Sequence, residues 1–375
     1  MRRKVMLEEV ISVVKLSLFP IWCWPQPQDA TQFKLFCVKL YYCLSIIIQI
    51  GLVAPLIYTI TKHLDEPEIL VQLIVMTSSS IHGSFNFFFH MVNHHHIQNV
   101  TFEMVHFSGL MKPHEEIVIQ RYVDKCIVFH SGSLFSYYSI LFFTIVLPFL
   151  TQQSFPTLAE YPFDVYHEPL KTIIYIHQSA AGTLVAGQLC TNVFMALLLW
   201  FATARFEILT EELEKVTNAY QLFKCIKEHQ ELLKYTEEVA IAARPFALTT
   251  IYCSTVSMIC AFLLFITNQP IALLLQCLGL AVAALSEVFM YCWPAEYLTH
   301  MSKNIAETAL YMLENNNFIE LWKCLQIIIM RSQKPIKTAI PCLMPALSLN
   351  YFTAYLSTIL SYFTTLRVMM DDDKN

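Results

Sequence analysis

Long stretches without a charged residue constrain this 375-residue chain more than any other feature. A bilayer core takes roughly 20 apolar residues per helix. The uncharged runs of at least that length are Leu40–Thr61, Leu70–Val92, Cys126–Ala159, Thr172–Ala204, Pro245–Ser286 and Ala339–Leu366. Pro245–Ser286 is long enough for two spans and is divided by Thr267-Asn268-Gln269-Pro270, which is typical of a tight turn. The pattern therefore predicts an all-α membrane protein with seven transmembrane helices.

The composition supports this fold class and excludes several others. Hydrophobic residues make up 56% of the chain and charged residues 14%, against roughly 45–50% and about 25% in soluble domains. A soluble enzyme, a nucleic-acid-binding protein, a disordered chain and a coiled-coil rod are all excluded. The sequence contains no metalloprotease, nucleophile-elbow, Walker or dinucleotide-binding motif. We therefore expect no enzymatic activity, no cofactor and no nucleic-acid partner.

Basic residues are distributed unevenly between the two sides of the predicted spans. They concentrate in the N-terminal segment and in the second, fourth and sixth connections, while the other side carries only Lys62, Lys171, Arg367 and Lys374. The positive-inside rule then places the N-terminus inside and the C-terminus outside. This orientation is the reverse of that of a G-protein-coupled receptor.

The inner segments have apolar positions at helical spacing. Between Arg205 and Arg244, the residues Phe206, Leu209, Leu213 and Val216 share one face. This stretch predicts a continuation of the fourth span into the cytosol, and Glu296–Leu313 predicts the same after the sixth span. Val10–Trp24, interrupted by Lys15 and Pro20, is interpreted as an amphipathic segment on the inner leaflet.

The predicted organisation has seven parts, and their ranges follow from the runs above. They are a cytosolic segment (1–35), helices 1–4 (36–203), a cytosolic helical anchor (204–248), helices 5 and 6 (249–292), further anchor helices (293–342), a seventh helix (343–368) and a short extracellular tail (369–375).

Ionisable residues are scarce in the spans, which argues against a pump or an ion-coupled carrier. Glu287 is placed near the inner end of the sixth span, where it is expected to reach water. His82, His130 and His177 are the other candidates and are interpreted as packing residues. Adjacent histidines on a helix point in different directions, so we predict no metal site at His94-His95-His96.

Short motifs near the C-terminus resemble those of the insect odorant receptor family. They are Ile305-Ala306-Glu307-Thr308, Ile329-Met330-Arg331-Ser332-Gln333-Lys334-Pro335, Tyr351-Phe352-Thr353 and Ser361-Tyr362-Phe363-Thr364-Thr365-Leu366-Arg367. Tyr161-Pro162-Phe163-Asp164 and Trp24-Pro25 match as well. The chain departs from the family pattern at Leu313–Phe318 and at Ile340-Pro341-Cys342. It lacks the long inner-loop insertion of the shared co-receptor, so it resembles a ligand-tuned subunit.

The resemblance implies a ligand-gated, non-selective cation channel, built as a heterotetramer with the co-receptor. Its pore would be lined by the last helix of each subunit, with the constriction near Thr365. Ser361, Val368 and Met369 would share that face. A hydroxyl at Thr365 would make a wetter gate than the apolar residue common in the family.

The resemblance also implies a pocket for small volatile ligands in the outer half of the helix bundle. The matching positions are Ile74, Thr77, Ser78, Tyr137, Tyr138, Leu141, Phe142, His177, Ala181, Leu184, Tyr252 and Thr255. Apolar walls with a few hydroxyls suit such ligands. The expected partners are the co-receptor, a volatile ligand, permeating cations and the lipid bilayer. The expected location is the plasma membrane of an olfactory neuron dendrite.

Three alternatives remain beside this interpretation. They are a seven-helix G-protein-coupled receptor, a gustatory-type chemoreceptor and a small-solute carrier. The predicted topology and the absence of Asp-Arg-Tyr and Asn-Pro-x-x-Tyr motifs contradict the first. The gustatory terminal signature is also absent, and the spans lack the charges that a carrier uses.

Overall fold

The computed structural model describes residues 6–27, 29–150, 153–266, 271–315, 322–340 and 343–372. Within these ranges the secondary structure is helical, apart from a single bridge between Ile340 and Met344. The helices are α1 (Leu7–Ser17), η1 (Phe19–Ile21), α2 (Gln32–Lys62), α3 (Pro67–Val92), α4 (His94–Leu110), α5 (Pro113–Leu150), α6 (Leu170–Glu214), α7 (Ala219–Ile266), α8 (Ile271–Asn315), α9 (Trp322–Ser332) and α10 (Leu349–Asp372). This arrangement confirms the predicted all-α fold class.

Seven of these helices carry the uncharged runs: α2, α3, α5, α6, α7, α8 and α10. By length and composition, five described helices can cross a membrane, namely α2, α5, α6, α7 and α8. The helices α3 and α10 have 26 and 24 residues, but the most apolar described stretch of each is less apolar than those of the other five. Polar residues such as Ser80, His82 and Asn86 on a buried face of α3 lower its hydropathy.

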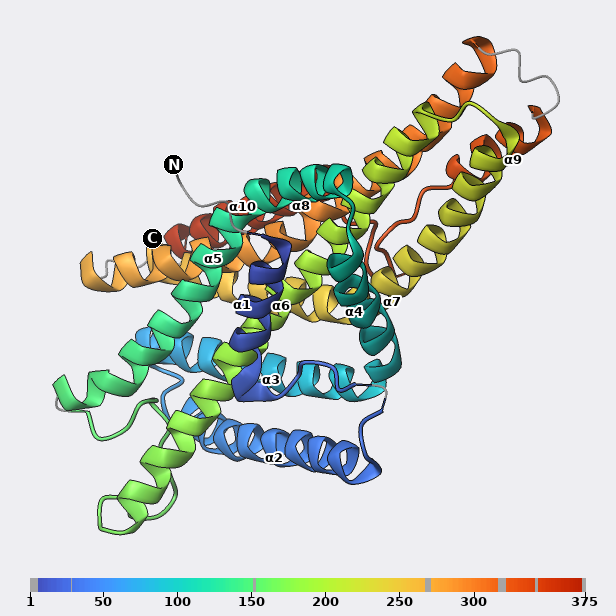
Figure 1. The fold of residues 1–375 in the computed structure, drawn as a ribbon. Helices are drawn as coiled ribbons and strands as arrows, with labels where there is room; N and C mark the ends of the chain where they lie inside the picture. The colour runs from blue at the N-terminus through green and yellow to red at the C-terminus, as the bar shows by residue number, and fades with distance from the viewer. Residues whose placement is uncertain are drawn as a thin grey trace, which may run out of the picture.

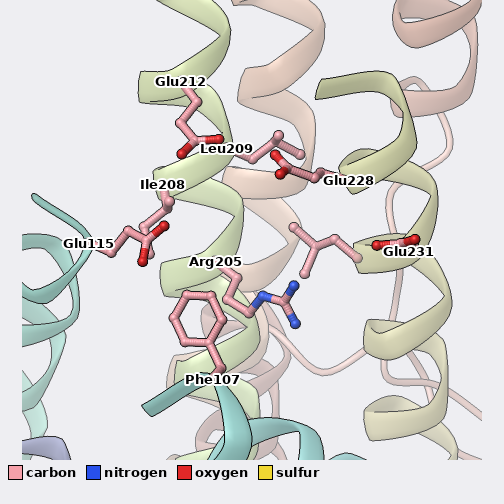
Figure 2. Close-up of a pocket in the computed structure, with 9 residues that line it drawn as sticks. Phe107, Glu115, Arg205, Ile208, Leu209, Glu212, Glu228 and Glu231 are labelled. Carbon is pink, nitrogen blue, oxygen red and sulfur yellow. The ribbon is translucent and has the colours of Figure 1, made fainter. Parts of the chain in front are cut away.

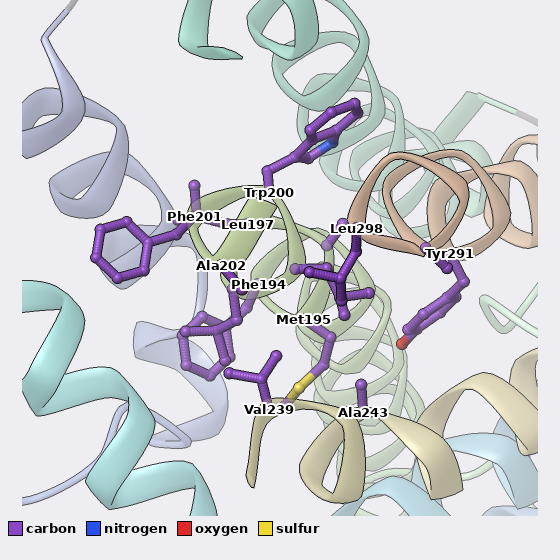
Figure 3. Close-up of a cluster of buried hydrophobic side chains, with 14 of the residues drawn as sticks. Phe194, Met195, Leu197, Trp200, Phe201, Ala202, Val239, Ala243, Tyr291 and Leu298 are labelled. Carbon is purple, nitrogen blue, oxygen red and sulfur yellow. The ribbon is translucent and has the colours of Figure 1, made fainter. Parts of the chain in front are cut away.

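Helix α6 is the centre of the molecule (Figure 1). It packs against α2, α3, α5, α7 and α8, and 89% of its most apolar 18-residue window is buried. Phe194, Leu197 and Trp200 of α6 are at most 3% exposed, and Figure 3 shows Val239 and Ala243 of α7 and Leu298 of α8 beside this helix. A helix that is apolar on every side needs such a central position, because each face must be covered.

The C-terminal ends of α6 and α8, the N-terminal end of α7 and the helix α9 form one extension, at the upper right of Figure 1. Helix α6 continues to Glu214, and α7 starts at Ala219 after a short connection in which Asn218 accepts a hydrogen bond from Gln221 N (2.9 Å). Phe206, Leu209, Leu213 and Val216 are buried, as their spacing predicts. The fourth span thus continues beyond membrane length and folds back towards the fifth.

The interpretation of the N-terminal segment as an amphipathic helix on the inner leaflet stays a prediction, and the structure shows what covers one of its faces. Leu7, Val10, Ile11 and Val14 of α1 are at most 8% exposed, and α1 packs against α4, α5 and α6. One apolar face is therefore covered by the chain's own helices, whereas Val13, Leu16 and Phe19 are 53%, 73% and 75% exposed. An apolar stripe in a sequence does not say which apolar surface will cover it.

Several sequence features lie outside the described residues. They are the predicted turn at 267–270, residues 316–318 of the first departure from the family pattern, Pro341-Cys342 of the second, residues 373–375 of the tail, and the side chain of Met369.

Candidate functional site

Four helices meet in a buried polar network, which we call the inner polar layer (His82, Asn192, Thr250 and Tyr291). Oδ1 of Asn192 in α6 accepts hydrogen bonds from Tyr291 of α8 (2.9 Å) and from Thr250 of α7 (3.1 Å). The Nε2 atom of His82 in α3 lies 3.4 Å from the same Thr250 hydroxyl. None of the four residues is more than 3% exposed. Since buried polar groups are costly without partners, the network fixes the relative positions of these helices.

A second set of polar side chains lies one helical turn away, and we call it the carboxylate layer (Tyr137, Cys253, Ser254 and Glu287). Ser254 follows Thr250 by four residues, and Glu287 precedes Tyr291 by four. Helices α7 and α8 are consecutive, packed and antiparallel, so both steps lead in the same direction from the inner polar layer. The side chain of Ser254 lies next to the Glu287 carboxyl group.

The expectation that Glu287 reaches water is wrong. The residue is 9% exposed, because the helices around α8 cover it. In the described part of the chain, Glu287 forms no ion pair. An intramembrane carboxyl group without a basic partner marks a functional site by default, because such groups are costly to bury.

Tyr137 of α5 and Ser78 of α3 connect the predicted ligand positions to this layer. Tyr137 is 4% exposed, its hydroxyl has no hydrogen-bond partner among the described residues, and Glu287 and Tyr291 are its charged and polar neighbours. The Sγ atom of Cys253 lies 3.9 Å from the carbonyl oxygen of Ser78, and Glu287 lies within electrostatic reach of Cys253. Sequence reasoning missed Cys253 and Ser254. The signal for them was their spacing on α7 relative to Thr250.

Other predicted ligand residues form the packed wall between α2, α3 and α6. Ala181 is fully buried, and its carbonyl oxygen accepts a hydrogen bond from Gln49 of α2 (3.4 Å). Leu184 is buried and Ile74 half-buried against the main core. The Thr77 hydroxyl donates to the Leu73 carbonyl of its own helix (2.7 Å).

The remaining predicted positions differ in their burial and in their contacts. Tyr138 donates to the Ser17 carbonyl (2.5 Å), so its hydroxyl is engaged by the N-terminal segment. Phe142 and Tyr252 are 60% and 70% exposed on the surface of the single chain. Leu141 lies against Gly182, and His177 lies against Gly51 of α2.

A loop before α6 covers one end of the bundle. The Gln178 side chain accepts a hydrogen bond from Thr157 N (3.0 Å) and donates one to the Tyr161 hydroxyl (3.3 Å). Glu160 contacts His63 at the end of α2, with 2.8 Å between Nε2 and Oε1. Hydrogen bonds to Glu160 and Glu66 raise the pKa of His63 above its ordinary value. The cover is therefore attached to both α2 and α6.

Helix α10 buries one face and leaves the other open. Tyr355 and Ile359 are buried, and the Thr255 hydroxyl of α7 donates to the Tyr355 hydroxyl (3.3 Å). The predicted pore residues Ser361, Thr365 and Val368 are exposed on the other side. Thr255, predicted as a ligand residue, is thus in contact with the predicted pore helix.

The extension formed by the end of α6 and the start of α7 contains a cavity of about 180 Å³ lined by acidic side chains (Figure 2). Glu115, Glu212, Glu228 and Glu231 approach it from three helices, and Arg205 pairs with Glu103 at its edge. Burial, followed by the charge of Glu212, raises the pKa of Glu228. Donor atoms of Glu212, Cys225 and Glu228 lie within 4.8 Å of one another and have the chemistry to hold a cation.

Ammonium groups already occupy much of the space around these carboxylates. Lys112 pairs with Glu115 (3.3 Å), and Lys224 pairs with Glu228 (3.2 Å). These ion pairs balance the acidic charge without a metal ion, so we assign the cluster a structural role.

Comparisons with known proteins agree with the fold. Residues 66–360 match the family model described as 7tm Odorant receptor. The chain is 24% identical over 249 residues to odorant receptor 13a of Drosophila melanogaster, and the alignment spans 59% of each protein.

Solved structures of the olfactory receptor OR5 from Machilis hrabei are similar over 96% of this chain and 98% of theirs. The TM-score is 0.75 for OR5 alone, at 16% identity, and 0.74 for OR5 in complex with eugenol, at 15% identity.

Proposed function

This chain belongs to the 7tm odorant receptor family, a family of receptors and not of enzymes, and on that premise we propose that it is a ligand-tuned subunit of a channel. The proposed channel is cation-permeable, non-selective and opened by small volatile apolar ligands. It assembles with a co-receptor as a heterotetramer in the plasma membrane of olfactory neuron dendrites, with the N-terminus inside and the C-terminus outside.

The observation that carries this proposal is the two-faced burial of α10. One face packs on α7 and α8 through Tyr355 and Ile359, while Ser361, Thr365 and Val368 face away from the rest of the chain. An amphipathic helix with an uncovered hydroxyl-bearing face suits a water-filled pore shared between subunits.

Contacts between α10 and the bundle provide a route by which a ligand would act on the pore. Thr255 joins α7 to Tyr355, and the rings of Phe262 and Phe363 are in tilted contact, with centroids 4.9 Å apart. A ligand opens a channel only through contacts that differ between the closed and open states. We place those differences at the α7–α10 contacts.

Co-expression with a co-receptor and recording of currents under an odorant panel test this function. The expected result is an odorant-evoked cation current that neither the co-receptor alone nor this chain with a mismatched membrane protein produces. Surface expression of both chains without any evoked current would contradict the proposal.

Epitope tags test the topology separately. An N-terminal tag should be reached by antibody only after permeabilisation, and a C-terminal tag in intact cells. The reverse result would overturn the proposed orientation and the positions of the inner segments with it.

A further inference from the structure

We propose that the carboxylate layer recognises the nitrogen of a small volatile amine, with Glu287 as the residue that selects this ligand class. The inference rests on the proposed function, since it names the ligand class of the same receptor. The first supporting observation is the position of Glu287: a carboxyl group that is 9% exposed within a transmembrane helix and has no cationic partner in the described structure.

The depth of the layer places it within the membrane. At 1.5 Å per residue, Ser254 lies about 18 Å and Glu287 about 24 Å from the joined ends of α7 and α8. The hydrocarbon core is about 30 Å thick. Lipid offers no counter-charge at this depth, so the partner of the carboxyl group must come from the protein or from a ligand.

Around the carboxyl group, the described part of the protein supplies hydroxyl groups, which can donate to the carboxylate and also accept a hydrogen bond, rather than a cation. Tyr137 contributes a buried hydroxyl without a partner, and Ser254 contributes a second hydroxyl beside Glu287. An ammonium group has three donors and no acceptor, which matches one carboxylate and two hydroxyl oxygens.

The surroundings suit an apolar substituent on the nitrogen. One turn outward from Ser254, α7 presents Met258, and about one turn outward from Glu287, α8 presents the small side chain of Ala284. On the inner side, the hydrogen-bonded residues Asn192, Thr250 and Tyr291 close the site. An amine bound to Glu287 would therefore extend its alkyl chain away from the inner polar layer.

Charge balance favours an amine over a free metal ion or a quaternary ammonium ion. An amine and a carboxylic acid form a pair that is neutral overall wherever the proton resides. A fixed cation would instead have to bring its full charge across the apolar cover, at a high desolvation cost. A neutral alcohol has one hydroxyl hydrogen to donate. It would leave the Glu287 carboxyl group, the strongest acceptor in the site, without its full set of hydrogen bonds.

The test compares hexylamine with 1-hexanol and heptane on cells that express this chain and a co-receptor. Hexylamine should evoke half-maximal current at a concentration at least about tenfold below that of 1-hexanol, since a charge-assisted bond separates them. Glu287→Gln should raise that hexylamine concentration at least about tenfold and change the response to neutral ligands less than about threefold. Glu287→Asp, which keeps the carboxyl group, should retain most of the amine response.

Three results would overturn the proposal. They are equal potency of hexylamine and 1-hexanol, equal losses for amine and neutral ligands in Glu287→Gln, and loss of the amine response in Glu287→Asp with surface expression intact.

A binding measurement separates this proposal from the channel function. Hexylamine should raise the melting temperature of the purified full chain in detergent, and Glu287→Gln should remove that shift. If the shift is present but no odorant evokes current, the channel proposal fails and the amine site stands. If neutral odorants evoke current but hexylamine neither binds nor opens the channel, the amine site fails alone.

Discussion

The helices α6 and α10 both carry a transmembrane run, but their surroundings differ. Every residue of α6 from Thr191 to Ala204 is buried. Of the described side chains of α10 between Leu349 and Val368, only Tyr355 and Ile359 are buried. The chain therefore supplies all the neighbours that α6 needs, whereas the open face of α10 is left for a pore or another subunit. Substitutions in the two helices should accordingly affect different properties.

The largest effect on stability is expected from Trp200→Ala in α6. Trp200 is 2% exposed, and its ring contacts those of Trp293 (centroids 5.1 Å apart) and Tyr297 (5.3 Å). Truncation leaves a cavity and should lower the free energy of unfolding by about 3–5 kcal/mol. Thermal unfolding in detergent measures this loss of stability. The control is Phe142→Ala, which truncates an aromatic side chain that is exposed. Equal losses in the two variants would mean that burial in α6 does not determine stability.

Gly187→Ala should have the next largest effect, through the contact of α6 with the N-terminal segment. A Cβ at this position would lie 2.4 Å from Cγ2 of Ile21. Overpacking outweighs the gain in helix propensity, so we expect a net destabilisation of about 1–2 kcal/mol.

Two variants control for the general effect of the glycine substitution. Gly132→Ala in α5, where a Cβ meets nothing within 4 Å, should be stabilising by about 0.5–1 kcal/mol. Adding Ile21→Ala to Gly187→Ala should restore part of the lost stability. A Gly187→Ala variant as stable as Gly132→Ala would refute the close packing of Ile21.

Thr365→Val on the open face of α10 should leave stability within about 0.5 kcal/mol of the parent. Its effect should instead be on current, because a methyl group in place of a hydroxyl favours dewetting of a constriction. Smaller currents and altered ion selectivity are expected in co-receptor recordings. The control is Thr364→Val, one position round the helix. Unaltered currents in Thr365→Val would remove this residue from the pore constriction.

The smallest effect is expected at the loop that covers one end of the bundle, where His63→Asn removes the contact with Glu160. The pKa of His63 is raised from 6.5 and that of Glu160 is lowered from 4.5. The histidine contribution is complete below pH 6.5 and is lost as the pH rises through the raised pKa. The carboxylate contribution is present above pH 4.5 and is lost as the pH falls through the lowered pKa.

The difference in melting temperature between parent and His63→Asn should thus be greatest between pH 4.5 and 6.5 and smaller at pH 8.5. A difference that grows with rising pH would show that the ion pair does not attach the cover.

The helical fold and its membrane-length runs could be predicted from the sequence because lipid imposes a simple rule on backbone polar groups. Each group must be bonded within its own segment, so uncharged runs become helices whatever their neighbours. The apolar spacing of Phe206, Leu209, Leu213 and Val216 likewise predicted a buried face. The sequence could not say what covers a face, so the packing of α1 against α4, α5 and α6 was known only from the structure.

The candidate site shows the same division. Of the residues predicted to bind a ligand, Tyr137 lies near Glu287 and Ser78 near Cys253 in the same layer, whereas Phe142 and Tyr252 are exposed on the surface of the chain. Position along the chain placed Glu287 at a span end, and only the packing of α5, α7 and α8 showed that it is buried. By itself, the sequence determined the helices and their apolar runs, since these depend on local hydrogen bonding and composition. The tertiary structure decided which polar groups lost contact with water, because burial depends on residues that are distant in the chain.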